Sequence, residues 1–211
     1  MEKSFRDIKA VMDAQGFLLD NKFYPREFSF VCEDFSVCYE VVFDLNDYVE
    51  DIKQVKRYIK HQRFKLHGLS LTPLLNPQSE QTISLEKLPE FVEFLYNRVQ
   101  RSSSSMIATK NDELISFLTG TSIKIFDLNT VPVGSAMCPT YSRLSVFEAN
   151  FCEIHEKVIN GNQYRCALRK SKIIWNWLNT KKNSADILLQ FKFSQENSSL
   201  SPISFVGDTV F

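Results

Sequence analysis

The chain has 211 residues, of which 44% are hydrophobic, and its 25 basic side chains are balanced by 25 acidic ones. This length suits one domain with a tail, and the neutral net charge excludes a global field that drives binding to nucleic acid or membranes. The sequence contains no run of about 18 apolar residues, so no membrane span is expected. The first residues are polar, so no secretory signal is expected either. The five cysteines are therefore expected to be reduced thiols.

Three strands are expected at the start of the chain. The first covers 8–18 and is followed by a turn at 20–22, and the second covers 23–32, where bulky and polar residues alternate with the period of a strand. Pro25 predicts an edge or a bulge near the start of that strand, because proline has no N–H to donate to a neighbour. A third strand over 36–43 completes an antiparallel meander.

Helices and strands alternate after the meander. The expected elements are helices over 47–63, 85–101, 113–119 and 166–178, and strands over 106–109 and 122–128. The apolar segment 187–193 is either a strand or the end of a helix, and the Ser-rich segment 194–211 is expected to be a flexible tail. The sequence therefore predicts one α/β domain over 1–193, an RNase H-like fold with a mixed sheet that opens with the meander and is flanked by helices.

A late segment combines two cysteines and a histidine. Cys152, His155 and Cys166 have the spacing Cys-x2-His-x10-Cys, and thiolate sulfur and imidazole nitrogen are the ligands that tetrahedral zinc prefers. Cys138 would complete a sulfur-rich set of four. The alternative is two buried thiols and a surface histidine, because cysteine is often buried as a small hydrophobic residue.

Five segments follow the motif order of the DEDDh exonucleases, which have an RNase H-like fold. These segments are 13–15, 27–30, the His-Gly-Leu-Ser turn at 67–70, 111–112 and 165–171. The chain resembles that family in this order, and the resemblance implies that Asp13 and Asp112 are remnants of its catalytic carboxylates. The alternatives are a turn residue for Asp13 and a helix cap for Asp112.

The departures from the DEDDh pattern affect the residues that hold the metal ions. Neutral or cationic residues occupy three positions: Gln15 in the first motif, Tyr164 or Arg165 at the general-base histidine, and Arg169 or Lys170 at the last aspartate. Two divalent ions need several carboxylates, and a cation repels them. The sequence therefore predicts that two-metal nuclease chemistry has been lost.

Loss of the carboxylates together with gain of a Cys/His set resembles the Maelstrom domain of animal germline small-RNA silencing. The resemblance covers roughly residues 8–180 and implies a structural zinc held by Glu27, Cys152, His155 and Cys166, which leaves Glu27 and Cys138 as rivals for the fourth position. It also implies RNA binding and a place among the proteins of a piRNA-type silencing complex, as in small insect proteins that silence transposons. Such a protein is expected in a cytoplasmic perinuclear granule or in the nucleus.

Basic residues are concentrated in two helices. Lys56 and Lys60 share a face of the helix expected over 47–63, while Arg165, Arg169 and Lys170 lie at the start of the helix expected over 166–178. Each group is either a strip that contacts phosphates or an ordinary solvated helix face.

Taken together, these patterns predict a catalytically degenerate RNase H-like domain that binds RNA or serves as a scaffold in transposon or piRNA-type silencing. Two alternatives stay open: a nuclease with residual or metal-independent RNA cleavage, and a protein-interaction module that uses 203–206 or an exposed tryptophan. Trp175 and Trp177 lie two apart on a helix, so we expect one in the core and the other exposed. No pattern indicates a small-molecule substrate.

Overall fold

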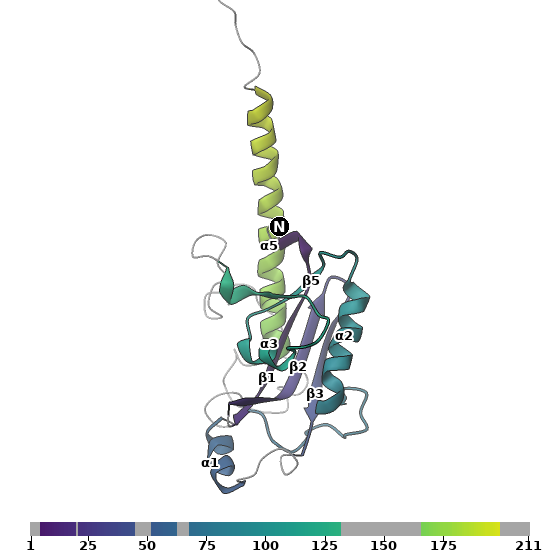
Figure 1. Ribbon diagram of the computed structural model, residues 1–211, viewed down its shortest axis with the longest axis vertical. Helices are drawn as coiled ribbons and strands as arrows, with labels where there is room; N and C mark the ends of the chain where they lie inside the picture. The colour runs from purple at the N-terminus through teal and green to yellow at the C-terminus, as the bar shows by residue number, and fades with distance from the viewer. Residues whose placement is uncertain (1–4, 20, 45–51, 63–67, 132–165, 199–211) are drawn as a thin grey trace, which may run out of the picture.

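A six-stranded mixed sheet flanked by helices forms the centre of the computed structural model, which describes residues 5–19, 21–44, 52–62, 68–131 and 166–198 (Figure 1). Within these residues, side chains are described except at 52–55, 58 and 183–198. The strand order is β4-β3-β2-β1-β5-β6. The chain is therefore an α/β protein, as predicted.

The first three strands form the expected antiparallel meander. β1 (Ile8–Leu19) pairs with β2 (Lys22–Cys32), which in turn pairs with β3 (Ser36–Val42). Asn21 has a φ of 60° in the turn between β1 and β2, a left-handed conformation that asparagine tolerates better than most residues.

Shorter parallel strands extend the sheet on both sides. β5 (Met106–Thr109) pairs with β1, and β6 (Ile125–Asp127) pairs with β5. β4 (Thr82–Ser84) pairs with β3 at the opposite edge. The prediction of a strand over 122–128 was too long, and β4 was not predicted at all, because three residues are too few to show a period of two.

Four α-helices and three 3-10 turns accompany the strands in the described part of the chain. They are η1 (Phe5–Asp7), α1 (Ile52–Gln62), η4 (Leu85–Lys87), α2 (Leu88–Val99), α3 (Asp112–Phe117), η5 (Leu128–Thr130) and α5 (Ala167–Ser198). α5 is longer than expected and extends beyond the sheet (Figure 1). Segment 187–193 is therefore helical, and 194–198 belong to this helix rather than to a tail, while 199–211 lie outside the described residues.

Each face of the sheet has its own apolar layer. α2 packs its buried residues Leu88, Val92 and Leu95 into one cluster with Phe28 and Phe30 of β2. On the other face, α5 contributes to a second cluster, which contains Ile8, Val11, Ile173, Ile174, Trp177 and Leu178. Among the helices that the structure describes, none is long and apolar enough to cross a membrane.

A bulge in the β1–β2 pair adjusts the register near the candidate site. Gln15 pairs with Glu27, but the next residue, Gly16, pairs with Pro25, so Arg26 is the extra residue. This confirms the bulge or edge predicted from Pro25, and bulges are common next to functional sites because they redirect side chains.

Gly16 is expected to be indispensable to this bulge. A Cβ at Gly16 would lie 2.6 Å from the Cα of Pro25 and closer still to the carbonyl oxygen of Tyr24. Because backbone atoms cannot move aside cheaply, we expect Gly16→Ala to lower the free energy of unfolding by at least about 1–3 kcal/mol. Urea unfolding measures this change. An unaltered midpoint would show that β1 and β2 accommodate the added methyl group without strain.

Candidate functional site

Buried polar side chains lie on the face of β1 and β2 that α5 covers. Asp13 pairs with Ser29 across the two strands, and both share the side-chain parity of Val11 and Val31, which pack in the clusters on the α5 side. Asp13, Glu27 and Ser29 are at most 1% exposed. Such burial is unusual for carboxylates, so each needs partners that replace water.

Asp13 is held between α3, α5 and its own strand. Its Oδ1 accepts hydrogen bonds from the N–H of Ala14 at 2.9 Å and from Nδ2 of Asn111 at 3.1 Å. Its Oδ2 has no hydrogen-bond partner, and the Lys170 ammonium lies 3.8 Å away. Burial raises the pKa of Asp13, while the charge of Lys170 and the hydrogen bond from Asn111 act in the opposite direction.

Glu27 lies beside the first residue of α5 and two thiols. Its Oε2 accepts a hydrogen bond from the N–H of Ala167 at 3.0 Å, a favourable position for a carboxylate because a helix N-terminus is partially positive. Its Oε1 lies 3.4 Å from Sγ of Cys38 and 3.5 Å from Sγ of Cys166. Cys38 was missed by the sequence analysis, although β3 pairs it with Ser29.

The predicted zinc set is represented by two of its members. Glu27 and Cys166, 139 residues apart, are brought into contact. Cys152, His155 and the rival ligand Cys138 lie outside the described residues. Within the described part of the chain, no group of three or more His, Cys, Asp or Glu residues is arranged to hold a metal ion.

Asn111, rather than Asp112, reaches the cluster from α3. The Asn111 side chain caps α3 by accepting from the N–H of Leu114 at 2.8 Å, and its Nδ2 donates to Asp13 and to the carbonyl oxygen of Ala14. Asp112 is exposed, and its Oδ1 accepts from Nδ2 of Asn129 at 2.8 Å. The N-cap geometry thus turns Asn111 rather than Asp112 toward β1, and the interpretation of Asp112 as a catalytic remnant stays a prediction.

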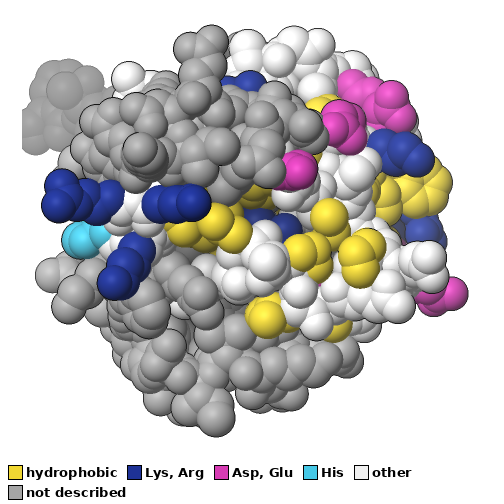
Figure 2. All heavy atoms as spheres, turned by 90° about the horizontal axis from the view of Figure 1, so that it is seen from below, with side chains coloured by type: hydrophobic (Ala, Val, Ile, Leu, Met, Phe, Trp, Pro, Cys, Tyr) yellow, Lys and Arg dark blue, Asp and Glu magenta, His cyan; other side chains and the backbone are white. Residues whose placement is uncertain are grey.

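The residues expected to contact phosphates differ in exposure. Arg169 is 9% exposed, and Lys170 is 15% exposed and directed at Asp13, while Arg165 lies outside the described residues. Lys56 and Lys60 are exposed on α1 together with Arg57 and His61. Figure 2 shows Lys and Arg side chains gathered around the histidine on this side of the molecule.

α1 is attached to the end of β1 that follows Asp13. The Gln62 side chain accepts from the N–H of Leu18 and donates to the carbonyl oxygen of Leu18, both at 2.8 Å. Ile59 is buried, so the opposite face of the helix presents its cations to solvent. The exposed basic strip of α1, made of Lys56, Arg57, Lys60 and His61, is thus fixed at the end of β1 that lies opposite Ile8.

The expectation that one tryptophan of α5 lies in the core and the other is exposed is confirmed in part. Trp177 is 3% exposed and belongs to the core, whereas Trp175 is partly buried and lines a cavity at the opposite end of β1.

The cluster as a whole is poorly suited to binding two divalent ions. Gln15 carries an amide rather than a carboxylate, and an ammonium faces Asp13. Mg²⁺ requires several oxygen ligands in near-octahedral geometry. The described residues make a buried polar centre that joins β1, β2, α3 and α5. Comparison of the chain with protein-family models, curated proteins and solved structures gave no match.

Proposed function

We propose that the chain is a catalytically degenerate RNase H-like domain of the Maelstrom type, which binds RNA and serves as a scaffold in a small-RNA silencing complex. The observation that carries this proposal is the Lys170 ammonium, 3.8 Å from the buried Asp13 carboxylate. A cation at this position neutralises the charge that a divalent ion would otherwise balance. The protein would then work in a cytoplasmic perinuclear granule or in the nucleus.

The sheet supports the fold part of this proposal. An antiparallel meander, continued by helices and parallel strands on the β1 side, is the arrangement expected of an RNase H-like domain. β4 is an additional edge strand. Asp13 lies on the central strand β1 and Lys170 in the first turn of α5, which is consistent with the motif order of the DEDDh exonucleases.

A structural zinc belongs to the same proposal. Glu27 and Cys166 are adjacent, and each provides an atom that zinc binds. We propose that they hold the ion together with Cys152 and His155, with Cys138 as the rival to Glu27. Cys38 is a further thiol beside Glu27. Zinc at this place would attach the start of α5 to β2, and such sites contribute directly to folding free energy.

The exposed basic strip of α1 supports RNA binding. Lys and Arg neutralise phosphates and release counterions, so each phosphate contact steepens the salt dependence of binding. The strip includes Lys56 and Lys60, which the sequence analysis proposed as phosphate contacts. Both side chains are exposed. Arg169 and Lys170 are largely buried, so Lys56 and Lys60 are the exposed ones among the predicted phosphate contacts that the structure describes.

The double variant Lys56→Gln/Lys60→Gln tests this assignment. We expect it to weaken binding to single-stranded RNA at every salt concentration and to reduce the salt slope by about 2, roughly one for each lost contact. Fluorescence anisotropy over a salt series measures both quantities. The matched control is Lys87→Gln/Lys124→Gln, two exposed cations outside α1. Equal effects of the two pairs would show that α1 holds no specific RNA-binding surface.

A further inference from the structure

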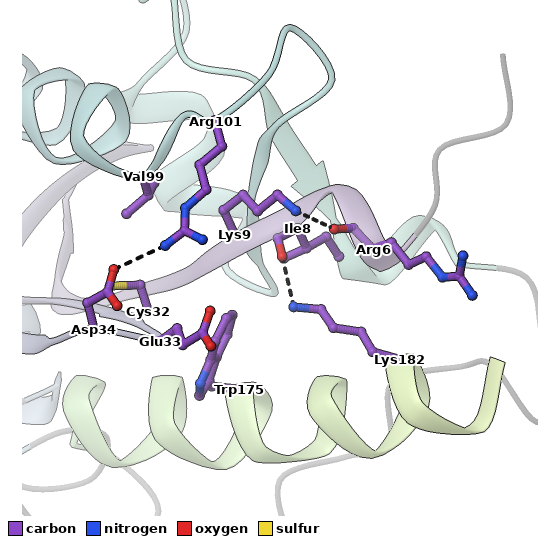
Figure 3. Close-up of a pocket in the computed structure, with 10 residues that line it drawn as sticks. All are labelled: Arg6, Ile8, Lys9, Cys32, Glu33, Asp34, Val99, Arg101, Trp175 and Lys182. Atoms are coloured by element: carbon purple, nitrogen blue, oxygen red, sulfur yellow. Dashed lines mark hydrogen bonds and ion pairs between the residues drawn. The ribbon is translucent and has the colours of Figure 1, made fainter. Parts of the chain in front are cut away.

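A cavity of about 450 Å³ lies at the start of β1, far from Asp13 along the strand (Figure 3). Five strand steps separate Ile8 from Asp13, which corresponds to roughly 16 Å. The cavity is formed by η1, β1, the end of β2, the end of α2 and the middle of α5. Its volume falls within the range of pockets that take small organic ligands.

Four cations line this cavity, and two carboxylates accompany them. The cations are Arg6, Lys9, Arg101 and Lys182, and the carboxylates are Glu33 and Asp34. They come from segments that are distant in sequence. Figure 3 shows Lys9, Glu33, Asp34, Arg101 and Lys182 around a common space, whereas the Arg6 guanidinium points away from it. Arg101 pairs with Asp34 at 3.4 Å, so the excess of positive charge in the lining comes from Arg6, Lys9 and Lys182 beside Glu33, and it favours an anionic ligand.

Two of the cations are held in place by neutral groups. Lys9 Nζ donates to the carbonyl oxygen of Arg6 at 2.8 Å, and Lys182 Nζ donates to the carbonyl oxygen of Ile8 at 2.9 Å. These bonds fix the positions of the ammonium groups without cancelling their charges. Burial and the nearby charge of Lys9 lower the pKa of Lys182, while the charge of Glu33 acts in the opposite direction.

An aromatic wall and an apolar floor complete the cavity. The Lys182 ammonium lies over the Trp175 ring, 4.4 Å from the ring centroid, and Trp175 remains partly exposed, so positive charge and open aromatic surface are adjacent. Ile8, Cys32 and Val99 are buried residues that also line the cavity. An aromatic ring beside ammonium groups suits a ligand with both a planar base and a phosphate, because bases stack on tryptophan and phosphates pair with cations.

We propose that this cavity binds a nucleoside monophosphate, either free or as the terminal nucleotide of a strand. The phosphate contacts Lys9 and Lys182, and the base packs against Trp175. Glu33 and Asp34 accept hydrogen bonds from sugar hydroxyls or base amino groups. This site is separate from the basic strip of α1 and does not depend on the proposed fold family or on RNA binding by α1.

Titration of the full chain with adenosine 5′-monophosphate, adenosine and inorganic phosphate tests the proposal. We expect the monophosphate to bind more tightly than either fragment and to quench tryptophan fluorescence. Trp175→Phe should remove most of the quenching, because Trp177 is in the core. Lys9→Gln/Lys182→Gln should raise Kd by at least about tenfold, since each charge-assisted hydrogen bond contributes more than a neutral one.

Two further measurements distinguish a free nucleotide from the end of a strand and provide the control variant. A short oligoadenylate with a 5′-phosphate, compared with the same strand without it, reports binding of a strand end. If only the phosphorylated strand binds, and binding depends on Lys9 and Lys182, the terminal nucleotide is the ligand. Lys87→Gln, an exposed cation outside the cavity, should leave Kd unchanged. The proposal is overturned if neither ligand binds, if inorganic phosphate binds as tightly as the monophosphate, or if Lys87→Gln weakens binding equally.

Discussion

Replacing Arg26 by methionine is expected to lower the free energy of unfolding by about 3–5 kcal/mol, the range for removing one partner of a buried ion pair. Arg26 and Glu40 are 1% and 2% exposed, and Arg26 Nη2 lies 2.9 Å from Glu40 Oε1. Arg26 also donates from Nε to the carbonyl oxygen of Ser70 at 3.0 Å and from Nη1 to that of Val41. Methionine keeps the apolar bulk but leaves these acceptors and a buried charge without a partner.

The same pair fastens the segment after residue 68 to the sheet. Glu40 accepts from the N–H groups of Leu74 and Leu75, both at 2.8 Å. Leu75 packs against the cluster that contains Cys166 and Leu168 at the start of α5. Loss of Arg26 is therefore expected to loosen the support of the candidate site as well as the sheet edge.

Urea unfolding of Arg26→Met beside Arg101→Met measures the effect. Arg101 pairs with Asp34 at 3.4 Å, but both side chains are 67% exposed, so its loss should change stability by less than about 1 kcal/mol. If the two variants unfolded at the same urea concentration, the Arg26–Glu40 pair would contribute no more than a surface ion pair.

Lys170→Met is the second change with a large expected effect, about 2–3 kcal/mol at pH 7, because it leaves a buried carboxylate without its counter-charge. The value is below that of a fully buried pair because Lys170 is 15% exposed. Methionine keeps helix propensity and most of the apolar stem. The substitution therefore removes mainly the interaction of the ammonium group with the Asp13 carboxylate.

The pH dependence separates this cause from a packing defect. Burial already raises the pKa of Asp13, and Lys170 holds it down, so the variant raises it further. A folded-state pKa above the unfolded value means that the folded protein binds the proton more tightly, and stability then falls as pH rises through the folded pKa. The cost of Lys170→Met relative to wild type should therefore shrink as pH is lowered toward the unfolded pKa of Asp13.

A series of unfolding curves between neutral and mildly acidic pH checks this sign. In Asp13→Asn/Lys170→Met the carboxylate is absent, so the double variant should be more stable than Lys170→Met at neutral pH and lose the extra pH dependence. Lys172→Met on the same helix is the matched control. A cost of Lys170→Met that stays constant with pH would mean that the ammonium does not neutralise Asp13.

The long strands and the amphipathic helix were predictable because their patterns are local. β1, β2 and β3 agree with prediction within one or two residues, and the Pro25 bulge follows from a missing N–H. β4 and most of the α5 extension were not predictable: a three-residue strand has no period, and the 183–198 segment lacks the clear apolar stripe of α2.

The polar cluster was only partly predictable because its contacts depend on register between distant segments. Asp13 was predicted as a catalytic remnant and Glu27 as a zinc ligand. The cation beside Asp13 can be assigned to Lys170 only once α5 is placed on the sheet. Asn111 and Asp112 are adjacent in sequence, and the helix cap decides which one reaches β1. Cys38 carries no motif, and its proximity to Glu27 arises from strand pairing.

The most direct test of the central claim is to incubate labelled single-stranded RNA with the full chain, with and without Mg²⁺ or Mn²⁺, and to measure binding and cleavage in the same samples. If Lys170 has taken the place of the metal ions, RNA is bound, stays intact in every sample, and binds equally well without added metal. Cleavage that requires Mn²⁺ and disappears in Asp13→Asn would contradict the account, because Asp13 would then be a working metal ligand.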